Sequence, residues 1–425
     1  MDVRWGARGR ERSRGVREPS GTGRGRAGRL AALLCGGLLL TVTACSAEGA
    51  GATQPGDGKG GSSSAAASPT ASQAEVTVSP KDGSGGVATT GALKVTAAHG
   101  RLRTVKVTSS KGKKVAGRIS GHGTLWEPTG HLTLHTRYAV AAIAEDSQGR
   151  PTTKHATFTT LKPAHTFVGT FTPENGQTVG VGMPVSLRFT RGITDPKAVE
   201  KAIRVTAKPS VPIAGHWFGN DRLDFRPEHY WKPGTKVTLS LALDGVEGRP
   251  DVFGTQAKKV SFTVGRSQIS YVNASTHQMK VVRDGKTLRT VPVTAGSPGH
   301  DTWNGKMVIS EKLRTTRMNS ETVGLGKSYD IKDVPHAMRL SDSGTFIHGN
   351  YWAAPYTFGH ANASHGCIGL RDLRGGSSGS QAGWFYANSL LGDVVEVSHS
   401  HDETVAPENG LNAWNMSWAD WKAPQ

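Results

Sequence analysis

A diverged internal repeat of alternating apolar residues constrains the fold of this chain most strongly. Residues 126–128 and 149–151 return in similar form at 225–227 and 248–250, in each case 99 positions later. Near these points apolar residues recur with a period of two, as over residues 138–142. This period indicates half-buried β-strands, because successive side chains of a strand point to opposite faces. Short strands in two copies of about 95 residues are typical of tandem Ig-like sandwiches.

The first residues have the features of an export signal. Arg-rich residues 1–29 precede an apolar run at 30–42, which is too short for a comfortable membrane span. The run is followed by Thr-Ala-Cys45, similar to a bacterial lipobox, in which a small residue precedes a cysteine that becomes lipidated. We expect Cys45 to carry lipid; an uncleaved signal anchor is the alternative. Cys35 would leave with the signal, so Cys367 remains as a free thiol and no internal disulfide is expected.

The chain is basic, with a formal net charge of +18, of which +6 lies in residues 1–29. The remaining +12 belongs to the part from Cys45 onward, because residues 30–44 carry no charge. Such an excess is compatible with a solvated basic surface or with a polyanionic partner. We expect no nucleic acid as partner, because an exported protein rarely meets any. A polyanionic cell wall fits an exported protein better.

Length and composition favour several β-domains. The chain has 425 residues, too many for one hydrophobic core, and is rich in Gly, Thr and Val. After the repeat, Asp284-Gly285 between two apolar segments predicts a β-hairpin. Residues 381–391 are the one clear helix that we predict. The strand predicted at 344–348 would end at His348 and place this side chain at a cleft.

The free thiol of Cys367 lies in a segment with the residue types of a nucleophilic site. A thiol attacks as thiolate, so it needs a base, and histidine is the usual one. His348 lies upstream, and His365 and Gly366 directly precede the cysteine. Gly366 allows a sharp turn that exposes the sulfur and directs backbone N–H groups at a developing oxyanion. The pattern therefore predicts a cysteine nucleophile with a histidine base.

Two other interpretations of this segment are weaker. Cysteine is often a small buried apolar residue, but the flanking Ser-His-Gly and the upstream histidine disfavour that explanation here. A zinc site is the second alternative, but its candidate ligands have spacings that match no common zinc motif. These candidates are His348, His360, His365 and Cys367.

His348 followed by Ser364-His365-Gly366-Cys367 resembles the signature of the L,D-transpeptidase (YkuD) family of peptidoglycan cross-linking enzymes. The resemblance extends from about Gln268 to the end of the chain and is greatest to multidomain enzymes of mycobacteria and other actinobacteria. Gly369 stands where the family usually has an Asn that helps to hold the active-site loop. A sortase is disfavoured, because nothing in the chain resembles that family's signature.

The resemblance implies a role for each motif residue. Cys367 would be the nucleophile and His348 the base, oriented through the backbone carbonyl of Gly349. The N–H groups of Gly366 and Cys367 would bind the oxyanion, with help from the Tyr329 hydroxyl. No metal or cofactor is implied. The residues implied to contact substrate are Tyr329, Ser343, Gly344, Asn362 and His365.

The same resemblance implies an L,D-transpeptidase, a cysteine acyltransferase. Cys367 would attack the third residue of a tetrapeptide stem, diaminopimelate, and expel the terminal D-Ala. The thioester would then pass to the side-chain amine of a second stem, which gives a 3→3 cross-link. Carbapenems, which mimic the acyl donor, would acylate Cys367. An L,D-carboxypeptidase or exchange enzyme acting on the same stems remains an alternative, as does an inactive wall-binding lipoprotein.

These expectations describe an exported protein, lipid-anchored at the outer face of the cytoplasmic membrane and reaching into the cell wall. Its fold would be mainly β, with two tandem Ig-like β-sandwich domains before a β-rich L,D-transpeptidase catalytic domain with one clear helix. The predicted parts are a lipoprotein signal peptide (1–44), a disordered tether (45–74), two Ig-like domains (75–163 and 164–266), the catalytic domain (267–399) and a Trp-rich tail that packs on the body (400–425).

Overall fold

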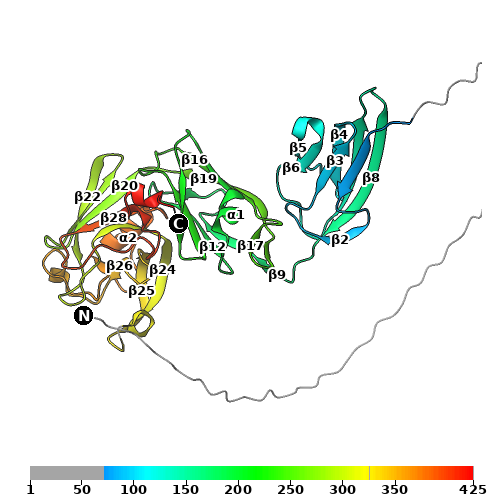
Figure 1. The fold of residues 1–425 in the computed structure, drawn as a ribbon. Coiled ribbons are helices and arrows are strands. Elements are labelled where there is room, and N and C mark those ends of the chain that lie inside the picture. The colour runs from blue at the N-terminus through cyan, green and yellow to red at the C-terminus, as the bar shows by residue number, and fades with distance from the viewer. Residues whose placement is uncertain (1–70, 325, 425) are drawn as a thin grey trace, which may run out of the picture. The chain divides into compact units, whose positions relative to one another are not determined.

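The computed structural model describes residues 71–324 and 326–424, and strands make up most of its regular structure (Figure 1). The predicted signal peptide, Cys45 and most of the predicted tether lie outside these residues. Ser72 and Gln73, at the end of the tether segment, hydrogen bond to Arg150 and Asp146. Within the described ranges no helix is long and apolar enough to cross a membrane. The predicted mainly β fold class is confirmed.

The first β-sandwich consists of two four-stranded sheets with a shared core. Tyr138, Val140 and Ala142 are all buried, so the period of two in the sequence corresponds to the buried face of β7. One sheet has the order β1 (Glu75–Ser79), β3 (Lys94–Ala98), β6 (Leu125–Pro128), β5 (Gly117–Ser120). The other has the order β2 (Ser84–Val87), β8 (Pro151–Thr160), β7 (Arg137–Glu145), β4 (Arg101–Ser109).

The second β-sandwich repeats this plan and adds one short helix, α1 (Pro196–Lys201). Asp195 caps this helix by accepting a hydrogen bond from Ala198 N. One sheet has the order β10 (Gly169–Thr172), β12 (Val185–Phe189), β15 (Arg222–Arg226), β14 (Ala214–Phe218). The other has the order β11 (Thr178–Val179), β19 (Ala257–Val264), β16 (Lys236–Ala242), β13 (Ile203–Lys208), and a small sheet joins β17 (Glu247–Arg249), β18 (Val252–Gly254) and β9 (His165–Phe167).

The third β-rich part is one nine-stranded mixed sheet. The Asp284-Gly285 hairpin forms as predicted, with both residues at positive φ (49° and 80°). The order is β23 (Gly305–Val308), β28 (Val394–Ser398), β20 (Gln268–Asn273), β21 (Gln278–Arg283), β22 (Lys286–Thr294), β27 (Ile368–Arg371), β26 (Phe346–Asn350), β25 (Asp330–Arg339), β24 (Glu311–Asn319).

The structure corrects two predictions for this part of the chain, one about a helix and one about a strand. The predicted helix is α2 (Gln381–Asn388), which stops before 391 because Ser389 adopts an extended backbone. The strand predicted at 344–348 is β26 (Phe346–Asn350), so His348 lies in the middle of the strand and not at its end. The strand starts later because Gly344 has a φ of 99°, which places it in a turn.

The Trp-rich tail contacts the second β-sandwich. Trp414 Nε1 donates to Gly182 O at 2.7 Å, and Trp421 Nε1 donates to Ala214 O at 3.0 Å. The buried guanidinium of Arg226 lies 4.9 Å from the ring centre of Trp414 and 4.4 Å from that of Trp421. The tail includes η4 (Ala413–Asn415) and α3 (Trp418–Trp421).

Candidate active site

The parallel pairing of β26 with β27 brings the predicted nucleophile and base together. His348 is opposite Gly369 in this register, and Ile347 is opposite Ile368. Cys367 directly precedes β27, so its side chain lies beside the start of β26. There the thiol accepts a hydrogen bond from Phe346 N at 3.4 Å and donates one to Gly344 O at 3.7 Å. A sheet contact therefore joins the two parts of the motif.

The thiol of Cys367 is protonated at neutral pH in this structure. Burial raises its pKa to about 11, although the Phe346 N–H and the positive charge of Arg339 act in the opposite direction. A thiol with such a pKa does not ionise by itself near pH 7. The proton must therefore leave as the sulfur attacks, which requires a neutral base at the site.

His348 has the properties of that base. It is only 4% exposed, and burial lowers its pKa, which keeps the imidazole neutral at pH 7. Its Nδ1 lies 2.9 Å from Gly349 O, the carbonyl that the sequence resemblance assigned to it. Because a carbonyl only accepts, Nδ1 carries the hydrogen and Nε2 is left as the proton acceptor.

An aromatic side chain that no sequence motif indicated covers His348. The Trp352 ring stacks on the imidazole, with ring centres 5.6 Å apart and planes at 18°. Trp352 is 43% exposed, so it forms a wall between His348 and solvent. Its position four residues after His348 was visible in the sequence, but nothing there indicated that its ring turns back over the imidazole.

The turn before Cys367 is closed by Ser364. Its hydroxyl accepts from Gly366 N at 3.2 Å and donates to Cys367 O at 2.6 Å. Gly366 has a φ of 105°, a conformation that other residues rarely adopt. A role of the Gly366 N–H as oxyanion donor, as expected from the sequence, would require it to leave the Ser364 hydroxyl.

The side chain of Tyr329, which lies near Cys367, contacts the ring of His365. Their ring centres are 5.0 Å apart, and His365 also contacts His300 at 4.9 Å. Burial and then the nearby Cys367 raise the pKa of Tyr329. Its hydroxyl therefore keeps its proton and is available as a hydrogen-bond donor near the thiol.

The three remaining residues that were expected to contact substrate are already engaged within the protein. Asn362 accepts from Ala295 N and donates to Ala274 O, both at 3.0 Å, so its amide holds the loop. The Ser343 hydroxyl accepts from Asn409 Nδ2 at 2.9 Å. The carbonyl of Gly344 accepts a hydrogen bond from the Cys367 thiol. Ser343 is nevertheless exposed at the surface.

Gly369 occupies a place with no room for a larger side chain. A Cβ there would lie 2.7 Å from Thr294 Cγ2 and 3.3 Å from Asn350 Nδ2. Asn350, buried on the neighbouring strand, accepts from the backbone N–H groups of Trp352 and Ala353 at 3.2 and 2.9 Å. The loop after His348 is therefore held by an asparagine of β26, Asn350. The family resemblance had instead indicated an asparagine on β27, at the position of Gly369.

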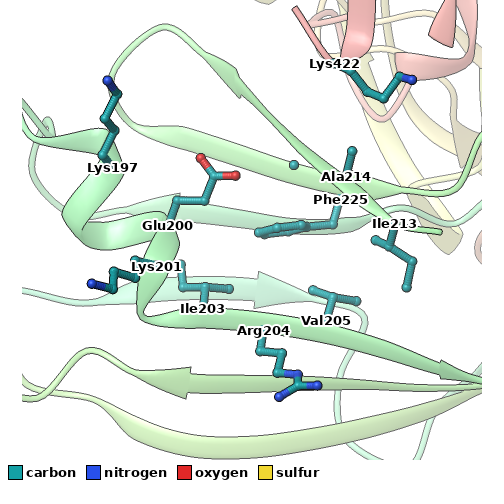
Figure 2. Close-up of a pocket in the computed structure, with 11 residues that line it drawn as sticks. Lys197, Glu200, Lys201, Ile203, Arg204, Val205, Ile213, Ala214, Phe225 and Lys422 are labelled. Atoms are coloured by element: carbon teal, nitrogen blue, oxygen red, sulfur yellow. The ribbon is translucent and has the colours of Figure 1, made fainter. Parts of the chain in front are cut away.

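Another hollow lies outside this site and has different chemistry. It occupies about 610 Å³ between β13 and β14 of the second sandwich and is lined by residues of that sandwich and Lys422. Figure 2 shows Glu200 extending from α1 towards Phe225 across this hollow. It has neither a cysteine nor a histidine in its wall, so it offers no nucleophile and base. Within residues 71–324 and 326–424, no three His, Cys, Asp or Glu side chains are grouped as metal ligands.

Two family models and several known proteins match this chain. The family model of the L,D-transpeptidase catalytic domain matches residues 267–397, and that of the bacterial Ig domain matches residues 84–247. L,D-transpeptidase 2 of Mycobacterium tuberculosis is 35% identical over 352 residues, which cover 82% of this chain and 84% of that protein. L,D-transpeptidase 5 of the same species is 30% identical, with 81% and 76% covered. A solved L,D-transpeptidase in complex with imipenem is 31% identical, covers 56% of this chain and 100% of its own, and has a TM-score of 0.46.

Proposed function

Since the chain belongs to the L,D-transpeptidase family, we propose that this enzyme makes 3→3 cross-links in peptidoglycan through a thioester on Cys367. One observation carries the proposal: a neutral histidine with Nδ1 bound to a carbonyl lies on the strand beside a protonated thiol. Such a pair can transfer an acyl group from one amine to another. In each of the two half-reactions the histidine accepts a proton and then returns it.

In the first half-reaction, Cys367 Sγ attacks the carbonyl carbon of diaminopimelate in the donor stem while His348 Nε2 takes the thiol proton. The Tyr329 hydroxyl and the Cys367 N–H would stabilise the oxyanion. The C–N bond to the terminal D-Ala then breaks, and His348 returns its proton to the leaving amine. The products are a thioester on Cys367 and free D-Ala.

In the second half-reaction, the side-chain amine of a second stem attacks the thioester. His348 takes a proton from this amine, the C–S bond breaks, and the sulfur leaves and regains its proton from His348. Trp352 and the burial of His348 limit the access of water to the base. This favours an amine over water as acceptor, and hence transpeptidation over the carboxypeptidase reaction. A carbapenem would follow the first half-reaction, with its lactam carbonyl in place of the stem amide.

The proposal includes a location. Cys45 would carry lipid at the outer face of the cytoplasmic membrane, and the two Ig-like domains would extend the catalytic domain towards the wall. The apolar run at residues 30–42 and the small residues before Cys45 support it. Incorporation of radiolabelled palmitate into the wild type, and its loss in Cys45→Ala, would support the anchor. Palmitate-free protein in the culture medium would contradict it.

Mass spectrometry of disaccharide-tetrapeptide incubated with the full-length protein in detergent tests the reaction. Dimers that lack one D-Ala are expected, and Cys367→Ala should form none. His360→Ala removes an imidazole that lies 3.2 Å from the Phe358 carbonyl; it is the matched control and should keep activity. Tripeptide without dimer would indicate the carboxypeptidase or exchange reaction. Unchanged substrate and no carbapenem adduct on Cys367 would indicate an inactive wall-binding lipoprotein.

A further inference from the structure

A buried carboxylate lies directly behind the residue that orients His348. Asp372 follows the end of β27, and its backbone N–H donates to Asn350 O at 3.3 Å, where β26 also ends. Its side chain has no exposed surface. This carboxylate takes no part in the proton transfers of the proposed reaction, and no sequence motif indicated it.

The Asp372 carboxylate is held by three donors. His336 Nδ1 lies 2.6 Å from Oδ2, and Oδ1 accepts from Leu373 N at 2.8 Å and Ser377 N at 3.0 Å. A buried carboxylate is costly unless its oxygens are hydrogen-bonded, and here both are. The side chain therefore has one orientation, set by the loop that follows it and by His336.

The same oxygen that binds His336 packs against Gly349. A Cβ built on Gly349 would lie only 2.3 Å from Asp372 Oδ2 and 2.9 Å from Pro335 Cγ. Glycine is required there because the carboxylate fills the space of any side chain. The Gly349 carbonyl is the acceptor for His348 Nδ1. Asp372, Gly349 and His348 thus form a continuous line of contacts into the site.

His336 reaches Asp372 from an unusual backbone conformation. Its φ is 51°, in the left-handed region that residues other than glycine rarely adopt. Its ring contacts Tyr386 of α2 with centres 5.2 Å apart. On the other side, a Cβ on Gly376 would lie 2.9 Å from His336 Cε1, so the loop closes tightly around the ring. The local conformation therefore directs the imidazole at the carboxylate.

We propose that Asp372, held by His336, is a positioning residue for the base His348. It fixes the Gly349 peptide, and the carbonyl of that peptide sets the tautomer and the angle of the imidazole. In a Ser-His-Asp triad the carboxylate binds the histidine directly. Here the carboxylate acts one peptide further away, through Gly349. The inference deepens the proposed function and rests on it for the role of His348.

The test compares Asp372→Asn with wild type in the full-length protein in detergent, with imipenem as the acylating probe. Asparagine keeps an acceptor for Leu373 N and Ser377 N, so the variant is expected to fold. It turns an amide or an uncharged oxygen towards Gly349 and His336, which should displace the peptide. We expect the rate constant for acylation at saturating imipenem to fall about 10- to 100-fold, while the half-saturating concentration changes less than twofold.

Two His336 variants and one control separate positioning from general stability. His336→Asn tolerates the left-handed backbone and places an amide donor near the original Nδ1, so it should stay within about threefold of wild type. His336→Leu leaves Asp372 Oδ2, the oxygen that packs against Gly349, without its donor and should resemble Asp372→Asn. Arg374→Ala, in the same loop, removes a largely exposed ion pair with Asp333 and a cation–π contact with the Tyr351 ring but leaves the Asp372–His336 pair intact, so it should slow acylation far less than Asp372→Asn.

The tautomer of His348 gives a readout that does not depend on activity. In ¹⁵N-labelled wild type the Nδ1 of His348 should carry the proton, and in Asp372→Asn this resonance should shift or broaden. The inference is overturned if folded Asp372→Asn keeps the wild-type acylation rate and the wild-type His348 resonance. If imipenem does not acylate the wild type, the proposed function fails, and the His348 resonance alone then decides the positioning role.

Discussion

Asn350 lies beside Gly369 across the parallel pair of β26 and β27, with its amide nitrogen 3.3 Å from where a Cβ of residue 369 would stand. The two positions share one small space next to His348. Because Thr294 Cγ2 would lie only 2.7 Å from this Cβ, and Asn350 is held by the N–H groups of Trp352 and Ala353, the space opposite His348 fits glycine.

Gly369→Asn should therefore destabilise the protein. The new side chain would meet Thr294 Cγ2 at 2.7 Å as well as Asn350. Overpacking of this kind typically costs about 1–3 kcal/mol, which denaturant unfolding followed by tryptophan fluorescence would measure. Gly379→Asn is the matched control, because a Cβ there would meet only Ser377 Oγ at 3.8 Å. If the two variants were equally stable, a side chain at position 369 would not collide with Thr294 and Asn350.

The pH dependence of acylation should report a neutral base. The lowered pKa of His348 means that the imidazole loses its proton below the ordinary value of about 6.5. The rate of acylation by imipenem should therefore rise with pH through a midpoint below about 6.5 and be flat at pH 7 to 8. A midpoint near 8.5, the ordinary pKa of a thiol, would show instead that Cys367 ionises by itself.

In His348→Ala, the rise in the reaction rate of Cys367 with a midpoint below pH 6.5 should disappear. Without the base, the thiol reacts only as far as it ionises, and burial raises its pKa to about 11. Alkylation of Cys367 by iodoacetamide, followed by intact-mass spectrometry, should be slower at pH 7 by about 10²- to 10⁴-fold and should increase steadily up to the highest pH tested. A wild-type rate at pH 7 would argue against His348 as the base. His365→Ala, which keeps the base, should retain the wild-type pH profile.

Arg226→Met should loosen the tail from the second β-sandwich. Burial lowers the pKa of Arg226 to about 10, which still leaves the guanidinium charged at pH 7. It donates to Met416 O at 2.8 Å and lies over the rings of Trp414 and Trp421. A desolvated cation–π contact alone contributes about 2 kcal/mol, so the stability measured by denaturant should fall by at least that amount.

Limited proteolysis gives an independent measure of the tail in Arg226→Met. Cleavage between the nine-stranded sheet and the end of the chain should become faster than in the wild type. Arg204→Met changes an exposed arginine of the same sandwich and should leave both stability and cleavage unchanged. Wild-type resistance in Arg226→Met would show that the tail is held without this cation.

Much of the fold was predictable because the signals are local. The period of two in β7, the Asp284-Gly285 turn and the start of α2 at Gln381 each depend on neighbouring residues. The ends of elements were less predictable. Gly344 and Ser389 adopt backbone conformations, set by the surrounding turns, that displace the predicted bounds of β26 and α2.

The amino-acid sequence was sufficient to identify a cysteine after Ser-His-Gly with a histidine upstream and to predict a mainly β fold. Both are properties of short segments, so no knowledge of distant contacts was needed. The surroundings of His348, in contrast, depend on contacts between residues that are distant in the chain. Asp372 and His336 are 36 residues apart in the chain, and they meet because β25, β26 and β27 are neighbours in one sheet. The packing of these strands, and not the motif, places the carboxylate behind Gly349.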